Sequence, residues 1–133
     1  MNPILFHMIA GAPEPVAPFS HATEVDGWVF VTGQMPTWPG RPDDAIPEGI
    51  EAQTRLVIEN LGLVLGGLGL SLREVVRAGA YLTHFGEDYP IFNRIYRSYF
   101  EPGRLPARTC IGVTELARGA RVEIDFIARR PAE

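Results

Sequence analysis

The chain lacks lysine altogether, so arginine supplies all twelve of its basic side chains. Sixteen acidic residues outnumber them and give a formal net charge of −4. Nucleic-acid binding depends on clustered Lys and Arg that neutralise phosphates, so this balance argues against a nucleic-acid partner. The absence of lysine by itself indicates no function.

Cysteine is scarce as well, since Cys110 is the only one. A single cysteine forms no intrachain disulfide, and a reducing, cytoplasmic location is therefore expected. Long apolar runs are also missing. The apolar stretch from Ile4 to Ile9 is too short to span a membrane, and no basic segment precedes it. We predict a first strand there rather than a signal, and no membrane partner.

The whole chain of 133 residues is 46% hydrophobic and 21% charged. This composition fits a single globular domain over residues 1–133, large enough to bury a core without disulfides or a structural metal. Clustered prolines predict loops at residues 11–18 and 36–47. Between them, the apolar, β-branched and aromatic run from Trp28 to Thr32 predicts a buried strand that ends at Gly33.

Two segments have helical periodicity. Apolar residues recur at helical spacing from Ile50 to Leu68 and predict a helix of about five turns, ended by the glycines at 66, 67 and 69. A second helix is predicted to begin at Asp88 as N-cap, with Pro90 in its first turn, and to stop at Pro102-Gly103.

Strand-like alternation follows over residues 75–83, 107–113 and 121–129. The order β-β-α-β-α-β-β predicts an α+β fold with both helices on one face of the sheet. The other face is only half polar, and no third layer is left to cover it. Oligomerisation through this face is the simplest solution, and it would place sites between subunits.

Two of these strands carry the candidate chemistry. Arg108 and Cys110 share one face of their strand, and Glu123 and Asp125 share the non-core face of the last strand. If the two strands pair, an arginine, a thiol and a carboxylate converge on one face. The alternative is a surface Arg–Glu pair beside a buried, inert cysteine.

Several motifs resemble those of the RidA (YjgF/UK114) family, in the family's order and with similar spacing. They are Gly33-Gln34-Met35-Pro36, Phe92-Asn93 with Tyr96 and Tyr99-Phe100, Pro106-Ala107-Arg108-Thr109-Cys110 and Val122-Glu123-Ile124, with a looser match at Pro18-Phe19-Ser20-His21-Ala22. The resemblance implies a chorismate-mutase-like, two-layer fold with a mixed sheet and two helices on one face. It also implies a homotrimer with sites between subunits, and no metal or organic cofactor.

The activity implied by the resemblance is hydrolysis of 2-imino or enamino acids, such as 2-iminopropanoate and 2-iminobutanoate, to 2-oxo acids and ammonia. In that reading Arg108 clamps the substrate carboxylate and Glu123 orients or activates water. The remaining pocket residues would be Phe19, Gly33, Asn93 and Cys110. The chemistry agrees, because a guanidinium binds a carboxylate bidentately and one carboxyl group can accept and return a proton.

Some features leave alternatives open. Phe19 stands where the family often has tyrosine, so a hydroxyl is missing, and Trp38 either borders the cleft or covers apolar surface in its loop. His21 is either a polar group of the site or a structural histidine. Cys110 is expected to be a pocket wall, because no histidine is placed in sequence to activate it. The histidines at positions 7 and 84 have no ligands at metal-binding spacing, so no metal site is predicted.

Two other functions fit the same scaffold. One is deamination of a larger catabolic enamine, with Phe19 and Trp38 shaping the pocket. The other is non-catalytic binding of small carboxylic acids by a sensor or partner protein. A ribonuclease activity gains little support from an acidic chain without a basic and aromatic stripe.

Overall fold

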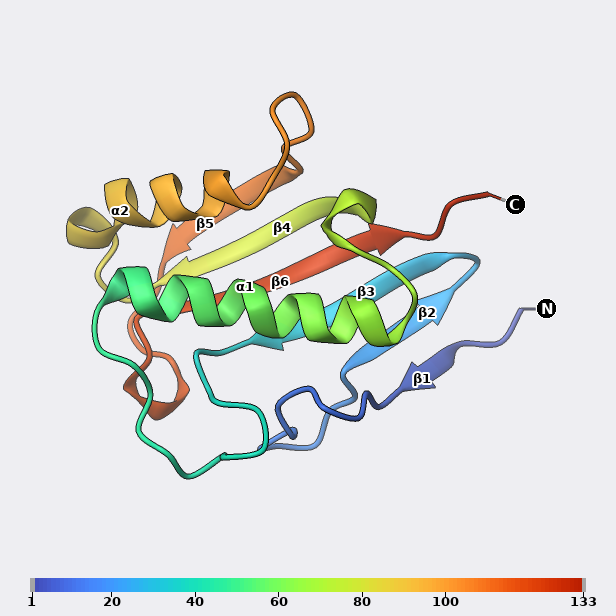
Figure 1. The fold of residues 1–133 in the computed structure, drawn as a ribbon, viewed down its shortest axis with the longest axis horizontal. Coiled ribbons are helices and arrows are strands. Elements are labelled where there is room, and N and C mark those ends of the chain that lie inside the picture. The colour runs from blue at the N-terminus through green and yellow to red at the C-terminus, as the bar shows by residue number, and fades with distance from the viewer. Residues whose placement is uncertain (1, 133) are drawn as a thin grey trace.

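The strand-like and helical patterns fold into two layers, a six-stranded sheet and two helices on one of its faces (Figure 1). The structure is a computed structural model and describes residues 2–132. Its main elements are β1 (Leu5–His7), β2 (Ala22–Val25), β3 (Trp28–Gln34), α1 (Ile50–Gly67), β4 (Val75–Leu82), α2 (Phe85–Ser98), β5 (Ala107–Gly112) and β6 (Val122–Arg129).

The strands lie in the order β1-β2-β3-β6-β4-β5, which puts the C-terminal strand β6 inside the sheet and β5 at its edge. β4 and β5 run parallel and are connected through α2, whereas the other neighbours are antiparallel. A parallel pair needs a long crossover connection, and a helix is the usual one. The predicted mixed sheet with two helices on one face is confirmed.

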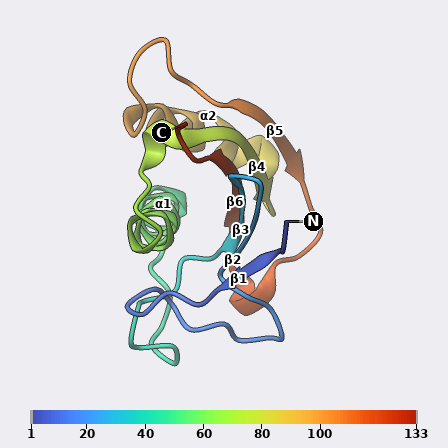
Figure 2. The same cartoon turned by 90° about the vertical axis from the view of Figure 1, so that its right-hand side faces the viewer.

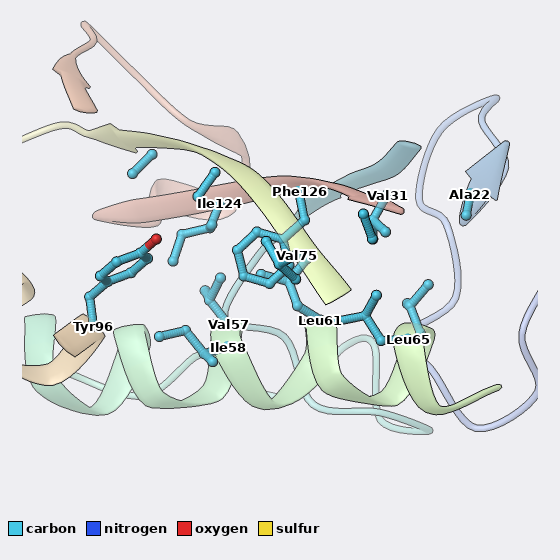
Figure 3. Close-up of a cluster of buried hydrophobic side chains, with 14 of the residues drawn as sticks. Ala22, Val31, Val57, Ile58, Leu61, Leu65, Val75, Tyr96, Ile124 and Phe126 are labelled. Atoms are coloured by element: carbon cyan, nitrogen blue, oxygen red, sulfur yellow. The ribbon is translucent and has the colours of Figure 1, made fainter. Parts of the chain in front are cut away.

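The core lies between α1 and the sheet. Figure 3 shows Val57, Leu61 and Leu65 of α1 pointing at the sheet, where Ile124 and Phe126 of β6 face them. All five side chains are at most 1% exposed. The spacing of the helical residues is one turn each, so a single stripe of α1 meets alternate residues of β6.

The first helix ends as its glycines predict. It spans 18 residues to Gly67, and Gly69 then takes a left-handed φ of 75°. The N–H of Leu70 donates to the carbonyl of Leu65 at 2.8 Å, which completes a Schellman-type end.

Two local predictions need correction. The second helix begins at Phe85 rather than at Asp88, whose N–H donates to the carbonyl of His84 within the helix. The Asp88 carboxylate instead accepts two hydrogen bonds from Arg121, at 2.8 and 2.9 Å, and ties α2 to the segment before β6. Strand β2 was not predicted. It forms a hairpin with β3 through Asp26 and Gly27, both in the left-handed region.

The face of the sheet opposite the helices is uncovered in a single chain, as the edge-on view in Figure 2 shows. Phe6, Phe30 and Ile111 are exposed on this open face, at 69%, 44% and 46%. No helix within residues 2–132 is long and apolar enough to cross a membrane.

Candidate functional site

Arg108 sits on the edge strand β5, with its side chain against α2. Its Nη2 donates to Oδ1 of Asn93 at 2.8 Å and to the hydroxyl of Tyr89 at 3.3 Å. The guanidinium carbon lies 4.9 Å from the ring centroid of Tyr96 and 5.4 Å from that of Phe92. Aromatic faces attract a guanidinium, so α2 holds Arg108 by both hydrogen bonds and cation–π contacts.

The rest of the Arg108 guanidinium remains available. Within residues 2–132, Nε and Nη1 have no hydrogen-bond acceptor. The side chain borders a cavity of about 310 Å³ whose other lining residues are Tyr89, Asn93, Tyr96, Arg97, Leu105 and Pro106. An anion that enters this cavity therefore meets the positive charge of Arg108 and N–H donors on Nε and Nη1 that the described residues leave unused.

Cys110 follows Arg108 on the same face of β5 and is only partly exposed. Burial raises the pKa of its thiol, against a smaller opposing effect of the Arg108 charge. A raised pKa keeps the group as a thiol near neutral pH, and the thiolate is the nucleophilic form. The raised pKa therefore argues against the nucleophilic role, and Cys110 belongs to the lining of neither the Arg108 cavity nor the cavity beside Glu123.

Tyr96 is a member of this cluster that the sequence did not single out as a site residue. Its ring is 4% exposed and its hydroxyl is buried without a hydrogen-bond partner among residues 2–132. Burial raises the pKa of this hydroxyl to about 12, opposed by the nearby Arg108 charge. Tyr96 thus stays neutral and presents its ring face to the guanidinium.

Glu123 lies on the open face of the sheet and packs against Gly33 of β3. A Cβ atom at Gly33 would lie 2.3 Å from Oε2 of Glu123, so only glycine leaves room for the carboxylate there. Burial raises the pKa of Glu123, and the neighbouring Asp125 charge raises it further. Asp125 in turn accepts a hydrogen bond from the hydroxyl of Tyr81 at 2.8 Å. A carboxyl group of raised pKa is suited to accept and return protons.

A second cavity of about 310 Å³ opens beside Glu123. Phe19 and Gly33, two of the residues expected in the pocket, both line this cavity. Trp38 does not belong to the lining. Its ring instead lies under the Arg41 guanidinium, and its Nε1 donates to the carbonyl of Ala45 at 3.0 Å.

His21 is a structural residue. Its ring is 3% exposed, Nδ1 accepts the N–H of Ile9 and Nε2 lies 2.7 Å from the carbonyl of Pro13. A carbonyl oxygen can only accept, so Nε2 carries the proton and the ring is neutral. Within residues 2–132, no group of three or more His, Cys, Asp or Glu could hold a metal ion.

The expected meeting of Arg108, Cys110 and Glu123 on one face is wrong within a single chain. β5 and β6 do not pair, because β4 lies between them. Arg108 and Cys110 stand beside Ala78 and Ala80, on the helix-covered face, whereas Glu123 stands beside Tyr81 on the open face. Directly paired residues share a face, so the two halves of the predicted site lie on opposite sides of the sheet.

Comparison with known proteins shows the family to which this chain belongs. The family model described as endoribonuclease L-PSP matches residues 9–130. The chain belongs to the RidA family. It is 35% identical to the mouse protein named 2-iminobutanoate/2-iminopropanoate deaminase over 117 residues, which cover 88% of this chain and 84% of the mouse protein. The family thus includes a protein named as an imine deaminase.

Solved structures agree with the assignment to the RidA family. YyfA of Yersinia pestis, described as a conserved Rid family protein of unknown function, superposes with a TM-score of 0.89 at 31% identity, covering 96% of this chain and 99% of YyfA. TdcF of E. coli, whose crystal structure has bound serine, gives a TM-score of 0.85 at 27% identity, covering 94% of this chain and 99% of TdcF.

Proposed function

We propose that this RidA family member hydrolyses 2-imino and enamino acids, such as 2-iminopropanoate and 2-iminobutanoate, to 2-oxo acids and ammonia. The observation that carries the proposal is Arg108, which is fixed by Asn93, Tyr89 and an aromatic wall, while Nε and Nη1 have no acceptor among residues 2–132. Every 2-imino acid has a carboxylate next to its reacting carbon. Binding that carboxylate at Arg108 fixes the carbon for attack by water.

Glu123 is the proposed proton-transfer group. Its carboxylate takes a proton from water as the water oxygen bonds to the protonated imine carbon, which gives a tetrahedral carbinolamine. The same carboxyl group then returns the proton to nitrogen, and the C–N bond breaks to release ammonia. The carbinol O–H gives its proton to the Glu123 carboxylate as the carbonyl forms, and that proton leaves with the ammonia as ammonium. One water is consumed and no electron is transferred. Burial against Gly33 and the Asp125 charge hold the pKa of Glu123 above its usual value, nearer the working pH.

This chemistry needs both halves of the site, and one chain holds them on opposite faces. We propose that a homotrimer unites them. Arg108 lies on an edge strand, so its cavity is at the rim of the sheet, and a neighbouring copy packed on the open face would bring its Arg108 to Glu123. A ring of three copies repeats this contact three times and closes.

Two observations support this assembly and its ligand class. The open face exposes Phe6, Phe30 and Ile111, and an uncovered apolar sheet face is suited to a second copy. The serine bound by TdcF carries the same carboxylate as the proposed substrates, beside an amino-bearing carbon. We expect no metal or organic cofactor, because a guanidinium and one carboxyl group suffice for the steps above.

The test generates 2-iminopropanoate or 2-iminobutanoate with a pyridoxal-phosphate-dependent serine or threonine dehydratase and traps the imine with semicarbazide. We expect the protein to speed the loss of imine, Arg108→Ala to abolish the gain, and Arg55→Ala, an exposed α1 residue paired with Glu51, to retain it. An unchanged rate with the wild-type protein refutes the proposal. Tight binding of 2-oxo acids without hydrolysis would instead favour a carboxylate-binding sensor.

A further inference from the structure

The cavity beside Glu123 has a largely apolar wall that the proposed reaction does not use. The wall combines the loop after β1, the end of β3 and the turn before β6. Its apolar members are Pro13, Pro15, Val16, Ala17, Phe19, Met35 and Ala117. Uncharged polar residues, Thr32, Gln34 and Thr37, also border it.

Three charged residues line the cavity, namely Glu14, Arg118 and Glu123. Glu123 is the proposed reacting group, and Glu14 is exposed. Arg118 is the basic residue of the lining, and its guanidinium is tied to the loop after β3, since Nη1 donates to the carbonyl of Pro42 at 2.6 Å and Nη2 to that of Asp44 at 3.1 Å.

Buried polar side chains hold the walls from outside the cavity. His21 binds the backbone of Ile9 and Pro13, where the apolar loop begins. Asn60, fully buried in α1, donates to the carbonyls of Met35 and Thr37 at 3.0 and 2.8 Å. His21, Asn60 and Arg118 thus hydrogen-bond to the backbone around the cavity from three separate parts of the chain. A cavity whose backbone is held in place by hydrogen bonds keeps its shape without a ligand, which lowers the entropic cost of binding.

The size of the cavity exceeds what a short substrate fills. Its volume of about 310 Å³ corresponds to roughly ten water molecules at their liquid share of about 30 Å³. A 2-iminopropanoate has only a methyl side chain, and its carboxylate would be directed away, toward the Arg108 of the neighbouring copy. Most of the apolar wall would then face water rather than substrate.

We infer that this cavity is a side-chain subsite, and that the substrates it selects are 2-imino acids with branched aliphatic or aromatic side chains. The inference rests on the proposed function, because it takes Glu123 as the group beside the reacting carbon. Val16 and Phe19, exposed at the cavity in the single chain, are the specificity-determining residues. An apolar side chain that displaces water from this wall gains affinity with each buried carbon.

The size of the preference follows from the number of carbons buried. One buried methylene is worth roughly fourfold in binding. The leucine-derived imino acid has three more side-chain carbons than the alanine-derived one, so complete burial gives roughly 50-fold and partial burial at least about tenfold. The asparagine-derived imino acid has as many non-hydrogen side-chain atoms as the leucine-derived one, and its amide gains no such preference.

The experiment compares these substrates directly. A flavin-dependent L-amino-acid oxidase with catalase produces imino acids from alanine, leucine and asparagine, and semicarbazide competition gives kcat/KM for each. We expect the leucine-derived substrate to exceed both others at least about tenfold. Val16→Asp should reduce the leucine-to-alanine ratio about tenfold, because a carboxylate then enters the apolar wall. Val76→Asp, a matched change at an exposed valine of β4 outside the lining, should leave the ratio unchanged.

Calorimetry with 4-methyl-2-oxopentanoate and 2-oxopropanoate separates this inference from the proposed function. Equal hydrolysis of all three imino acids overturns the subsite and leaves the deaminase in place. Absence of hydrolysis, with the branched oxo acid bound at least about tenfold more tightly, overturns the deaminase and keeps the subsite. Absence of both hydrolysis and preference overturns both.

Discussion

Gly33→Ala tests how closely the sheet is built around the Glu123 carboxyl group. The new Cβ would lie 2.3 Å from Oε2 and 3.0 Å from Cδ of Glu123. An ordinary contact begins near 3.4 Å, so the carboxyl group or the end of β3 must shift by about 1 Å. The φ of Gly33 is outside the left-handed region, and alanine itself is therefore compatible with the backbone.

The expected loss is large for activity and moderate for stability. A misplacement of about 1 Å in a reacting group lowers kcat/KM by about 100-fold, and overpacking lowers the free energy of unfolding by about 1–3 kcal/mol. Imine hydrolysis and denaturant unfolding measure the two effects. Gly86→Ala is the control, because apart from the adjacent residues and the backbone of α2 itself no atom lies within 4 Å of the added Cβ, and stability should rise by up to about 1 kcal/mol.

The assignment of Glu123 would be refuted by a Gly33→Ala protein that keeps wild-type kcat/KM. It would also be refuted if activity fell only in proportion to the fraction of unfolded protein. A loss of kcat/KM in fully folded protein is the result that the packing against Glu123 predicts.

Three further perturbations test neighbouring parts of the account. Asp125→Asn removes a charge that raises the pKa of Glu123, so the acid limb of the kcat/KM–pH profile should move to lower pH, and an unmoved limb would rule out this coupling. Cys110→Ala should keep kcat/KM within a few-fold of wild type, whereas a loss comparable to that of Arg108→Ala would make Cys110 the nucleophile. The hydrogen-bonded ion pair with Arg130 lowers the pKa of Glu24 from its usual value in the folded protein. The stabilisation by this pair is therefore fully present above the pKa of Glu24 in the unfolded chain, and it is lost as the pH falls through the pKa of Glu24 in the folded protein. Glu24→Gln should therefore lower the melting temperature at pH 7 and converge with wild type in acid, and parallel curves would contradict this.

Much of the fold could be predicted because burial leaves a local pattern. The apolar stripe of α1 and the alternating apolar residues of β6 each mark the one face of the element that is buried. Both patterns can be recognised without knowing which element packs against that face. The short strand β2 has only four residues and includes the buried, ion-paired Glu24, so its apolar signal was weak. The Asp26-Gly27 pair, a favoured hairpin turn, was the signal that could have identified it.

The site could be predicted only in parts. Alternation correctly placed Arg108 and Cys110 on one face of β5, and the structure brings Asn93 to Arg108. Alternation does not say which face meets the helices, nor which strands pair. Insertion of β6 between β3 and β4 is decided by tertiary contacts, and this order separates Glu123 from Arg108. The aromatic support from Tyr89 and Tyr96 was hidden, because both follow the buried stripe of an ordinary amphipathic helix.

The central claim is that each site takes Arg108 from one subunit and Glu123 from its neighbour. Arg108→Ala and Glu123→Gln subunits, each inactive alone, can be unfolded together, mixed in equal amounts and refolded. With random assembly into trimers, about one site in four combines an intact Arg108 with an intact Glu123 across a subunit boundary. We predict that the mixture regains about a quarter of wild-type imine hydrolysis. A mixture that stays inactive while forming the same assembly as the wild type would contradict the shared site.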